Sequence, residues 1–354
     1  MSSLPYYICY IIPASLFLGL YLGSWGIALP SLLGYVLLPC LDLVFKFEKG
    51  QLSPEQEAVI KDKWSFRLVT LLWAPVQVAV TLVGVWYAAT QNLSWWEFVL
   101  LVHATSVSNG GIGITISHEL CHRKTKLEQW ASQIILSTVN YMHFHIEHVV
   151  GHHQRVATPE DPATARLGES YYAFWLRSVV GSFRSAWEFE NKRVRLRKQS
   201  AWKLQNKMVN YLLVQSMISI AITVIFGPIG LTYHIAQSIL SFSTLENINY
   251  VEHYGLVRKK LENGRYEKVL PIHSWNSNHL VSNLFLFKLQ RHSDHHANAN
   301  RRYQVLRNFP EAPQLPVSYP TMVLLSYIPP LYKKVMTPLL EEHKLIQEQR
   351  SSVT

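Results

Sequence analysis

The chain has 354 residues, of which 49% are hydrophobic and only 16% are charged, and its formal net charge is +10. A soluble domain usually carries about 25% charged residues, so this composition argues against a soluble protein and favours an integral membrane protein. The three cysteines, Cys9, Cys40 and Cys121, form no Cys-x-x-Cys pair, which excludes a disulfide framework and a thiolate metal site.

Six apolar segments each approach the roughly 20 residues that a helix needs to cross the hydrocarbon core of a bilayer. In chain order they are 6–24, 27–45, 67–88, 97–117, 209–226 and 228–249. The first segment lacks a basic start and a small-residue cleavage site, so we expect a first span rather than a cleaved signal peptide. The sequence therefore predicts an all-α integral membrane protein with about six transmembrane helices, forming a single domain over residues 1–354.

Positive charge is strongly segregated along the chain. All 33 lysines and arginines lie in three intervals, 46–67, 117–208 and 251–354. With six spans, these intervals are the even-numbered loops and the tail, which share one side of the membrane. The positive-inside rule makes that side cytoplasmic. We therefore expect a cytoplasmic helical cap, and we attribute the net charge to topology and lipid headgroups rather than to nucleic-acid binding. The cap comprises 46–66, 118–208 and 250–354.

Histidines are concentrated in the same intervals, which hold fourteen of the sixteen in the chain. They form four groups that offer two, three, one and three candidate ligands. On a helix with about 100° per residue, histidines three or four positions apart point in similar directions. Nine imidazoles exceed what one zinc or iron ion takes, so the pattern predicts a dinuclear, histidine-rich metal site. The nine candidates are His118, His122, His148, His152, His153, His253, His292, His295 and His296.

Each histidine group also contains a carboxylate. A ligating imidazole usually donates its other N–H to a carboxylate or carbonyl, which fixes its tautomer. We therefore expect these acids mainly to hold the histidines rather than to bind the metals, and direct ligation is the alternative. The four acids are Glu119, Glu147, Glu252 and Asp294.

A competing motif is the sequence His-Glu-Leu-Cys-His at 118–122, a formal HExxH. In zinc metalloproteases the two histidines of this motif bind zinc and the glutamate is the general base. A membrane zinc protease is therefore an alternative, although it would leave six of the nine histidines without a role.

Four longer stretches resemble one family. They are HELCHR at 118–123, EHVVGHHQRVATPEDPATARLGES at 147–170, NYVEHYGL at 249–256 and HSWNSNHLVSNLFLFKLQRHSDHHA at 273–297. These motifs resemble the membrane alkane 1-monooxygenases, within the histidine-rich di-iron group of desaturases and hydroxylases. The resemblance is close from about 95 to 312, and the motif spacing favours the hydroxylase branch. Cys121 stands where a glycine is usual and Arg123 where a lysine is usual.

The resemblance implies that the nine histidines hold two iron ions. It implies a reaction with O2 that hydroxylates the terminal methyl group of medium- or long-chain n-alkanes taken from the bilayer. It also implies electrons from rubredoxin and its NAD(P)H-dependent reductase, and a location in the inner membrane if the source is bacterial. A related di-iron hydroxylase acting on aromatic methyl groups, fatty acids or terpenoids is the alternative.

Several polar groups near or inside the spans lie outside these motifs. We expect His103, His234, Asp42 and Glu246 to serve helix packing rather than chemistry, although intramembrane ionisable groups are functional candidates. The small residues of 109–113 either leave room for an alkyl chain or allow close helix packing.

Overall fold

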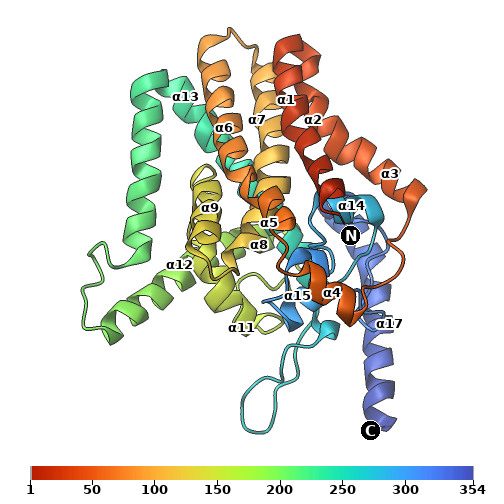
Figure 1. The fold of residues 1–354 in the computed structure, drawn as a ribbon. Coiled ribbons are helices and arrows are strands. Elements are labelled where there is room, and N and C mark those ends of the chain that lie inside the picture. Colours follow the sequence, from red (N-terminus) through yellow and green to blue (C-terminus); the bar gives the residue numbers. More distant parts are fainter. Residues whose placement is uncertain (1, 354) are drawn as a thin grey trace.

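The described part of the computed structural model covers residues 2–353, with side chains to 349. Within it the regular elements are all helices, and β-structure is limited to isolated bridges, which confirms the predicted all-α class. Figure 1 shows the apolar helices standing side by side at one end of the molecule and most of the remaining helices gathered at the other.

Within residues 2–353, five helical segments are long and apolar enough to cross a membrane. The first two are Leu4–Leu22 and Ser24–Phe45, and they are followed by Trp64–Thr90, Trp95–Cys121 and Lys207–His253. Most consist of several consecutive elements. These elements are η1 (Leu4–Tyr10), α1 (Ile11–Leu22), η2 (Ser24–Ala28), α2 (Leu29–Leu32), η3 (Leu33–Leu37), α3 (Leu38–Phe45), α5 (Trp64–Leu71), α6 (Trp73–Thr90), α7 (Trp95–Ser106), η4 (Val107–Ile114), α8 (Thr115–Cys121) and α13 (Lys207–His253).

Helix α13 covers both of the last two predicted spans. Its 47 residues are interrupted at Gly227, whose φ of 69° is non-helical, and Pro228 follows. At 1.5 Å per residue the helix would measure about 70 Å, more than twice the roughly 30 Å hydrocarbon core. The kink instead folds it into two legs, 207–226 (the first leg) and 228–253 (the second leg), which form an inverted V in Figure 1.

Hydrogen bonds between polar side chains connect the spans. Asn109 donates hydrogen bonds to Thr81 Oγ1 at 3.0 Å and to Gln237 Oε1 at 3.2 Å, which links the third and fourth spans to the second leg. The two histidines within the spans also have partners: His103 Nδ1 lies 2.7 Å from Ser31 Oγ, and His234 Nε2 lies 3.0 Å from Asn140 Nδ2. Each of these contacts joins segments that are far apart in sequence and helps the helices to pack together.

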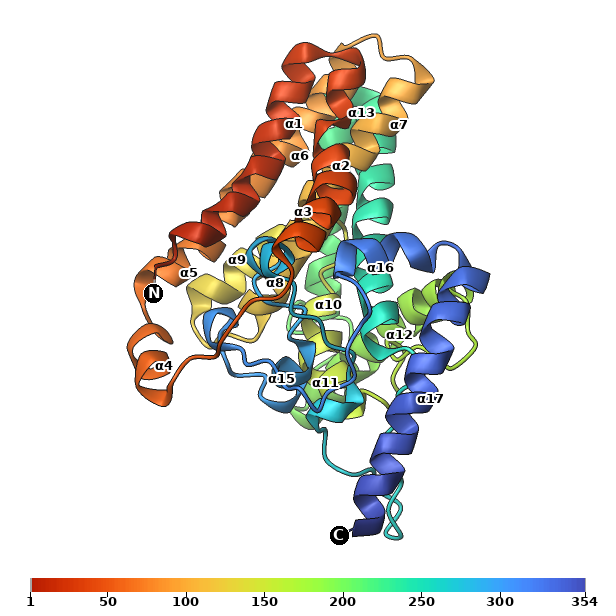
Figure 2. The same ribbon diagram turned by 90° about the vertical axis from the view of Figure 1, so that its right-hand side faces the viewer.

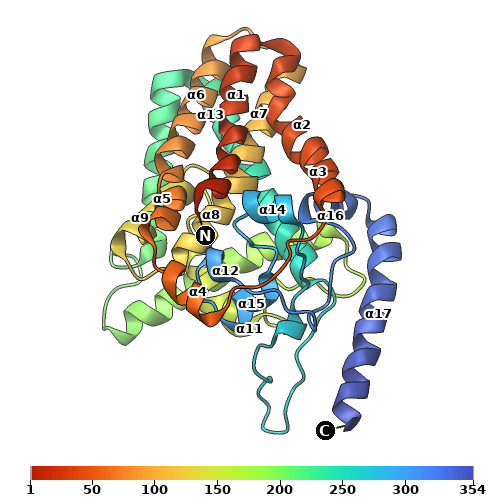
Figure 3. The same ribbon diagram turned by 45° about the vertical axis from the view of Figure 1, so that its right-hand side comes forward.

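The cap consists of the remaining helices and the loops between them (Figures 2 and 3). Helices α8, α10, α11 and α15 lie close together below the bundle, and α17 runs along its edge away from the spans. Residues 257–270 form a long loop that extends away from the bundle, about as far as the C-terminal end of α17 (Figure 3). The cap elements are α4 (Pro54–Ile60), α9 (Lys126–Ser137), α10 (Phe144–Ile146), η5 (Glu147–His152), α11 (His153–Arg155), α12 (Tyr171–Leu196), η6 (Pro271–His273), α14 (Leu280–Phe285), α15 (His292–Ala297), η7 (Tyr303–Val305), α16 (Tyr319–Ser326) and α17 (Pro329–Val353).

Candidate metal centre

All nine histidines singled out from the sequence converge where the fourth span and the second leg enter the cap. Their ligand nitrogens form two groups, and within each group these atoms all lie within 4.8 Å of one another. The five-histidine group comprises His118, His122, His148, His153 and His295. The four-histidine group comprises His152, His253, His292 and His296.

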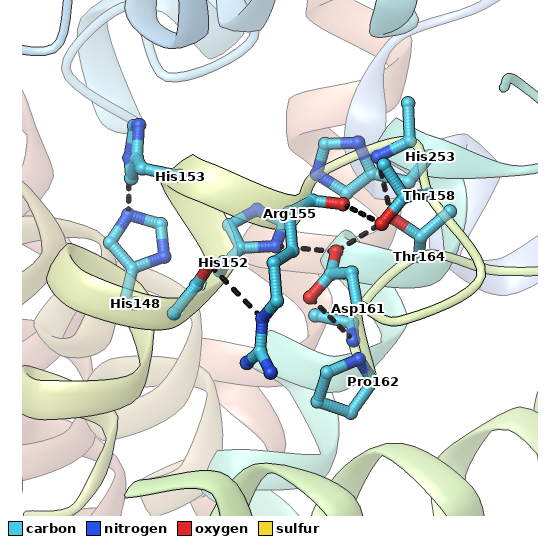
Figure 4. Close-up of polar contacts among 12 residues, drawn as sticks. His148, His152, His153, Arg155, Thr158, Asp161, Pro162, Thr164 and His253 are labelled. Atoms are coloured by element: carbon cyan, nitrogen blue, oxygen red, sulfur yellow. Dashed lines mark hydrogen bonds and ion pairs between the residues drawn. The ribbon is translucent and has the colours of Figure 1, made fainter. Parts of the chain in front are cut away.

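Segment η5 divides its histidines between the two groups. It is a π-helical turn, which is wider than an α-helical turn and frequent at functional sites. His148 and His153 belong to the five-histidine group, whereas His152 belongs to the other. Figure 4 shows His148 and His153 facing each other and His152 joined to a carboxylate elsewhere. The continuous stretch 148–153, which spans η5 and the first residue of α11, therefore contributes to both groups and places them next to each other.

Nitrogen atoms in both groups face each other at short range. His153 Nε2 lies 3.1 Å from both His148 Nε2 and His295 Nε2. In the other group, the Nε2 atoms of His152 and His296 are 3.2 Å apart, as are those of His253 and His292. Nitrogens about 2.0–2.1 Å from one ion at near-tetrahedral angles are about 3.3 Å from each other, so this spacing fits ligands of a shared ion.

Six of the nine candidate ligands, all outside the spans, are held in the neutral form that ligation requires. Burial, followed by the proximity of other histidines, lowers the pKa well below its usual value. In addition, the buried Nε2 atoms of His118 and His122 have no hydrogen-bond partner in the described part of the chain. A buried polar atom normally has a partner, so a cation bound by the five-histidine group would satisfy both nitrogens. The six candidate ligands with this lowered pKa are His122, His148, His153, His292, His295 and His296.

Two carboxylates contact the histidines, and only one of them is among the four expected acids. Glu252 Oε2 lies 3.0 Å from His292 Nε2. Asp161, which the sequence analysis did not single out, accepts a hydrogen bond from His152 Nδ1 at 2.9 Å (Figure 4). The available signal was weak, because Asp161 follows another acid, Glu160, in a loop with two prolines, nine residues beyond His152.

The other three acids pair with arginines, which differs from the expectation that they hold histidines. Glu119 Oε2 lies 3.2 Å from Arg123 Nη2, and Glu147 Oε1 lies 2.6 Å from Arg155 Nη2. Asp294 is fully buried and pairs with Arg307 at 2.9 Å and with a second arginine at 3.2 Å. These guanidinium groups are charged at any working pH and take the carboxylates away from the neutral imidazoles. These three acids therefore stabilise the surrounding chain through ion pairs and do not orient the imidazole rings directly.

Two cavities lie near the histidine groups. One is a small apolar cavity of about 60 Å³ between the spans, lined by Gly111, Thr115 and Tyr319 among others. Thr115 lies three residues before His118, so the cavity leads from the bundle towards the metal groups. The other is a polar surface pocket of about 700 Å³ whose lining includes His122 and Arg123.

Comparisons with known proteins identify the family. The fatty acid desaturase family model matches residues 93–325. The alkane 1-monooxygenase of Pseudomonas putida is 42% identical over 333 residues, which cover 92% of this chain and 82% of the relative. The chain belongs to the alkane 1-monooxygenase family. Alkane 1-monooxygenase 1 of Alcanivorax borkumensis is 40% identical over 92% of this chain and 81% of its own length. The xylene/toluene monooxygenase hydroxylase component of Pseudomonas putida is more distant, at 31% identity over 62% of this chain and 58% of that protein.

Membership of the alkane 1-monooxygenase family confirms the resemblance and the enzyme class predicted from the motifs: the chain is an oxidoreductase. The apolar helices and the histidine groups agree with a membrane enzyme that has a metal site. The HExxH sequence at 118–122 is therefore one part of a nine-histidine arrangement rather than a protease signature.

Proposed function

We propose that the protein hydroxylates the terminal methyl group of n-alkanes at a di-iron site held by the nine histidines. The observation that carries this proposal is the convergence of nine mostly buried imidazoles into two adjacent groups, in a chain with alkane 1-monooxygenases among its relatives. Imidazole also suits zinc and copper. The choice of iron therefore rests on the family and not on the donor set alone.

The two bound irons would supply the O2 activation that an inert C–H bond requires. In the overall reaction, O2, two electrons and two protons convert the methyl group to a primary alcohol and release one water. The chain itself positions the ligands: Asp161 orients His152, and π-helical η5 divides its histidines between the groups. Buried apolar side chains around the groups exclude water from the reacting methyl group.

The substrate would enter from the bilayer. A linear alkane gains about 0.8 kcal/mol per CH2 on leaving water, so it is concentrated among the lipid chains. The apolar cavity beside Gly111 and Thr115 leads from the spans towards His118, which supports delivery of a chain end to the metal groups. Medium- and long-chain n-alkanes are the substrate class that we propose.

Electrons would come from a separate carrier, because the sequence contains no nucleotide-binding fingerprint and no Cys-x-x-Cys pair. We propose rubredoxin with its NAD(P)H-dependent reductase. The segregation of lysine and arginine supports a cytoplasmic position for the cap, and in a bacterium the membrane would be the inner one. The basic run 192–198 would either dock an acidic carrier or face anionic headgroups.

A second candidate is hydroxylation of an aromatic methyl group, as the similarity to the xylene/toluene hydroxylase component suggests. We favour alkanes because the alkane 1-monooxygenases are more similar and match much more of the chain.

The test is reconstitution of the purified chain with Fe(II), rubredoxin and the reductase, followed by a chain-length series of n-alkanes and p-xylene. We expect two irons per chain and 1-alkanol as the product. His295→Ala should abolish hydroxylation, whereas His343→Ala on α17 should retain it. One zinc per chain without iron would contradict the di-iron site, and p-xylene oxidation without alkane oxidation would favour the second candidate.

A further inference from the structure

A groove of about 350 Å³ lies between α12 and the first leg of α13. One wall is a face of α12 with Val180 and Phe183, and the other is a face of the first leg with Leu212. The loop before α10 and Phe242 of the second leg close its back. Its lining includes none of the nine histidines, so the groove is separate from the metal centre.

Two polar atoms in this groove are buried without a hydrogen-bond partner in the described part of the chain. They are His143 Nε2 and the hydroxyl oxygen of Tyr211, whose residues are only 7% and 4% exposed. Burial lowers the pKa of His143 to about 3, so its imidazole is neutral and can donate one N–H. Leaving such groups unpaired is unfavourable, and a ligand with acceptor oxygens would satisfy both.

The rim of the groove carries an unpaired cation. Arg184 is exposed and makes no ion pair within residues 2–349, and no aspartate or glutamate lines the groove. The groove therefore presents a guanidinium group, a phenol O–H and an imidazole N–H. A guanidinium group binds phosphate and carboxylate oxygens especially well, so the donor set favours an anionic oxygen ligand.

The position of the groove along the first leg indicates where that ligand comes from. Met208, Tyr211, Leu212 and Gln215 occupy the first turns of this span, at the end that meets the cap. Further along, the leg exposes large apolar side chains to the surroundings: Leu213, Met217, Ile220, Val224 and Ile225. A ligand here would place its polar head at the membrane surface and its chain along an apolar helix.

We propose that this groove binds the phosphate headgroup of an anionic phospholipid, with one acyl chain lying along the first leg. The phosphate oxygens accept from Arg184, Tyr211 and His143. The first leg packs little against the rest of the molecule, because Met208, Tyr211 and Ile222 are the only buried residues among its twenty. The lipid therefore holds this leg against α12, a role that does not depend on the hydroxylation reaction.

The test uses the full chain, stripped of lipid in detergent and titrated with phosphatidylglycerol or phosphatidylcholine, with bound copies counted by native mass spectrometry. We expect phosphatidylglycerol to bind more tightly. Arg184→Gln should weaken its binding about fivefold, and Tyr211→Phe about threefold. Arg265→Gln makes the same charge change at an exposed arginine in the loop 257–270, outside the groove, and should have little effect.

A second measurement follows the thermal unfolding midpoint. Phosphatidylglycerol should raise the midpoint of the unmodified chain and of Arg265→Gln, and should raise that of Arg184→Gln much less. Because Arg184 is exposed, its substitution is expected to leave folding intact even if Tyr211→Phe does not fold. Equal binding of the two phospholipids, equal effects of the two arginine variants, or tighter binding of dodecanoate than of phosphatidylglycerol would overturn the assignment.

Discussion

A single buried carboxylate, Asp161, fixes the direction in which a central histidine faces. Its Oδ2 accepts from His152 Nδ1 at 2.9 Å and from Thr164 Oγ1 at 2.6 Å. Burial alone would raise the pKa of Asp161, but His152 and these hydrogen bonds hold it below the usual value. The carboxylate therefore stays charged, and the His152 Nε2 atom is left facing His296 at 3.2 Å.

Asp161→Asn should reduce metal affinity about 10- to 100-fold, because loss of the carboxylate partner frees the tautomer and orientation of His152. The effect can be measured as the Fe(II) binding isotherm of the purified apoprotein. Asp62→Asn is the matched control. The Asp62 side chain is 77% exposed, and its ion pair with Arg302 is long, at 3.6 Å. Equal isotherms for the two variants would show that Asp161 does not position the ligand.

At the residue scale, the spacing of the histidines in the sequence indicated which of them lie together, whereas the spacing of the acids did not indicate all of their partners. His118 and His122 share a helix face, so their common direction follows from periodicity alone. The partner of Asp294 is Arg307, thirteen residues away across an irregular loop, and no periodicity predicts that pair. Glu119 and Arg123 are four residues apart, a spacing that could have predicted their ion pair from the sequence.

At the element scale, η4 brings the fourth span unusually close to the second leg of α13. A Cβ atom added at Gly110 would lie 2.5 Å from the Ser241 backbone oxygen and 2.7 Å from its Cα, and neither atom can move without shifting the helix. A Cβ at the neighbouring Gly111 would meet nothing within 4 Å. The two explanations offered for the small residues at 109–113 therefore both apply: Gly110 allows close packing, whereas Gly111 faces open space.

Gly110→Ala should destabilise the protein by roughly 1–3 kcal/mol, because overpacking forces the two helices apart. Gly111→Ala, the matched control in the same turn, should change stability by much less. Thermal unfolding in detergent, with both variants in the same lipid, measures the difference. A smaller loss for Gly110→Ala than for Gly111→Ala would mean that the two helices do not meet at Gly110 as described.

The presence of several apolar helices was predictable from hydropathy, but the continuity of α13 was not. Segments 209–226 and 228–249 are separated in sequence only by Gly227, which reads equally well as a loop or as a kink. Pro228 can occupy the first turn of the second leg because the amide of that position is not needed there. The chain therefore turns back within a single residue of non-helical backbone.

At the scale of the whole molecule, long-range polar contacts fasten the cap to the spans. Asp42, inside the second span, accepts from the Ser282 backbone N–H at 3.0 Å and from its hydroxyl at 2.5 Å. Glu48 pairs with both Lys288 and Arg291 at 2.8 Å. These partners lie about 240 positions apart in sequence, so composition and periodicity could predict a cap above the membrane but not how it is held.

The large number of neutral, buried histidines has a consequence for the stability of the whole molecule. Outside the spans, burial lowers the pKa of ten histidines, including His143 to about 3 and His145 to about 4. Below the ordinary histidine pKa of about 6.5, these histidines bind protons in the unfolded chain but stay neutral in the folded chain. Lowering the pH therefore favours unfolding. Glu147 acts in the opposite direction, because burial raises its pKa to about 7, but it is one group against ten. The other eight histidines are His122, His148, His153, His273, His279, His292, His295 and His296.

We therefore expect the metal-free protein to lose stability steeply as the pH falls from about 6.5 to 5. A fully neutral histidine contributes on the order of 2 kcal/mol to this loss over that range. Loading with Fe(II) under anaerobic conditions should move the transition to lower pH, because the ion binds the neutral imidazoles and competes with protons. Unfolding midpoints of the apo and loaded forms, recorded in detergent from pH 8 to 4.5, give both curves. A midpoint of the apo form that stays constant between pH 7 and 5 would contradict the neutral, buried state of these histidines, whereas identical apo and loaded curves would contradict their role as ligands.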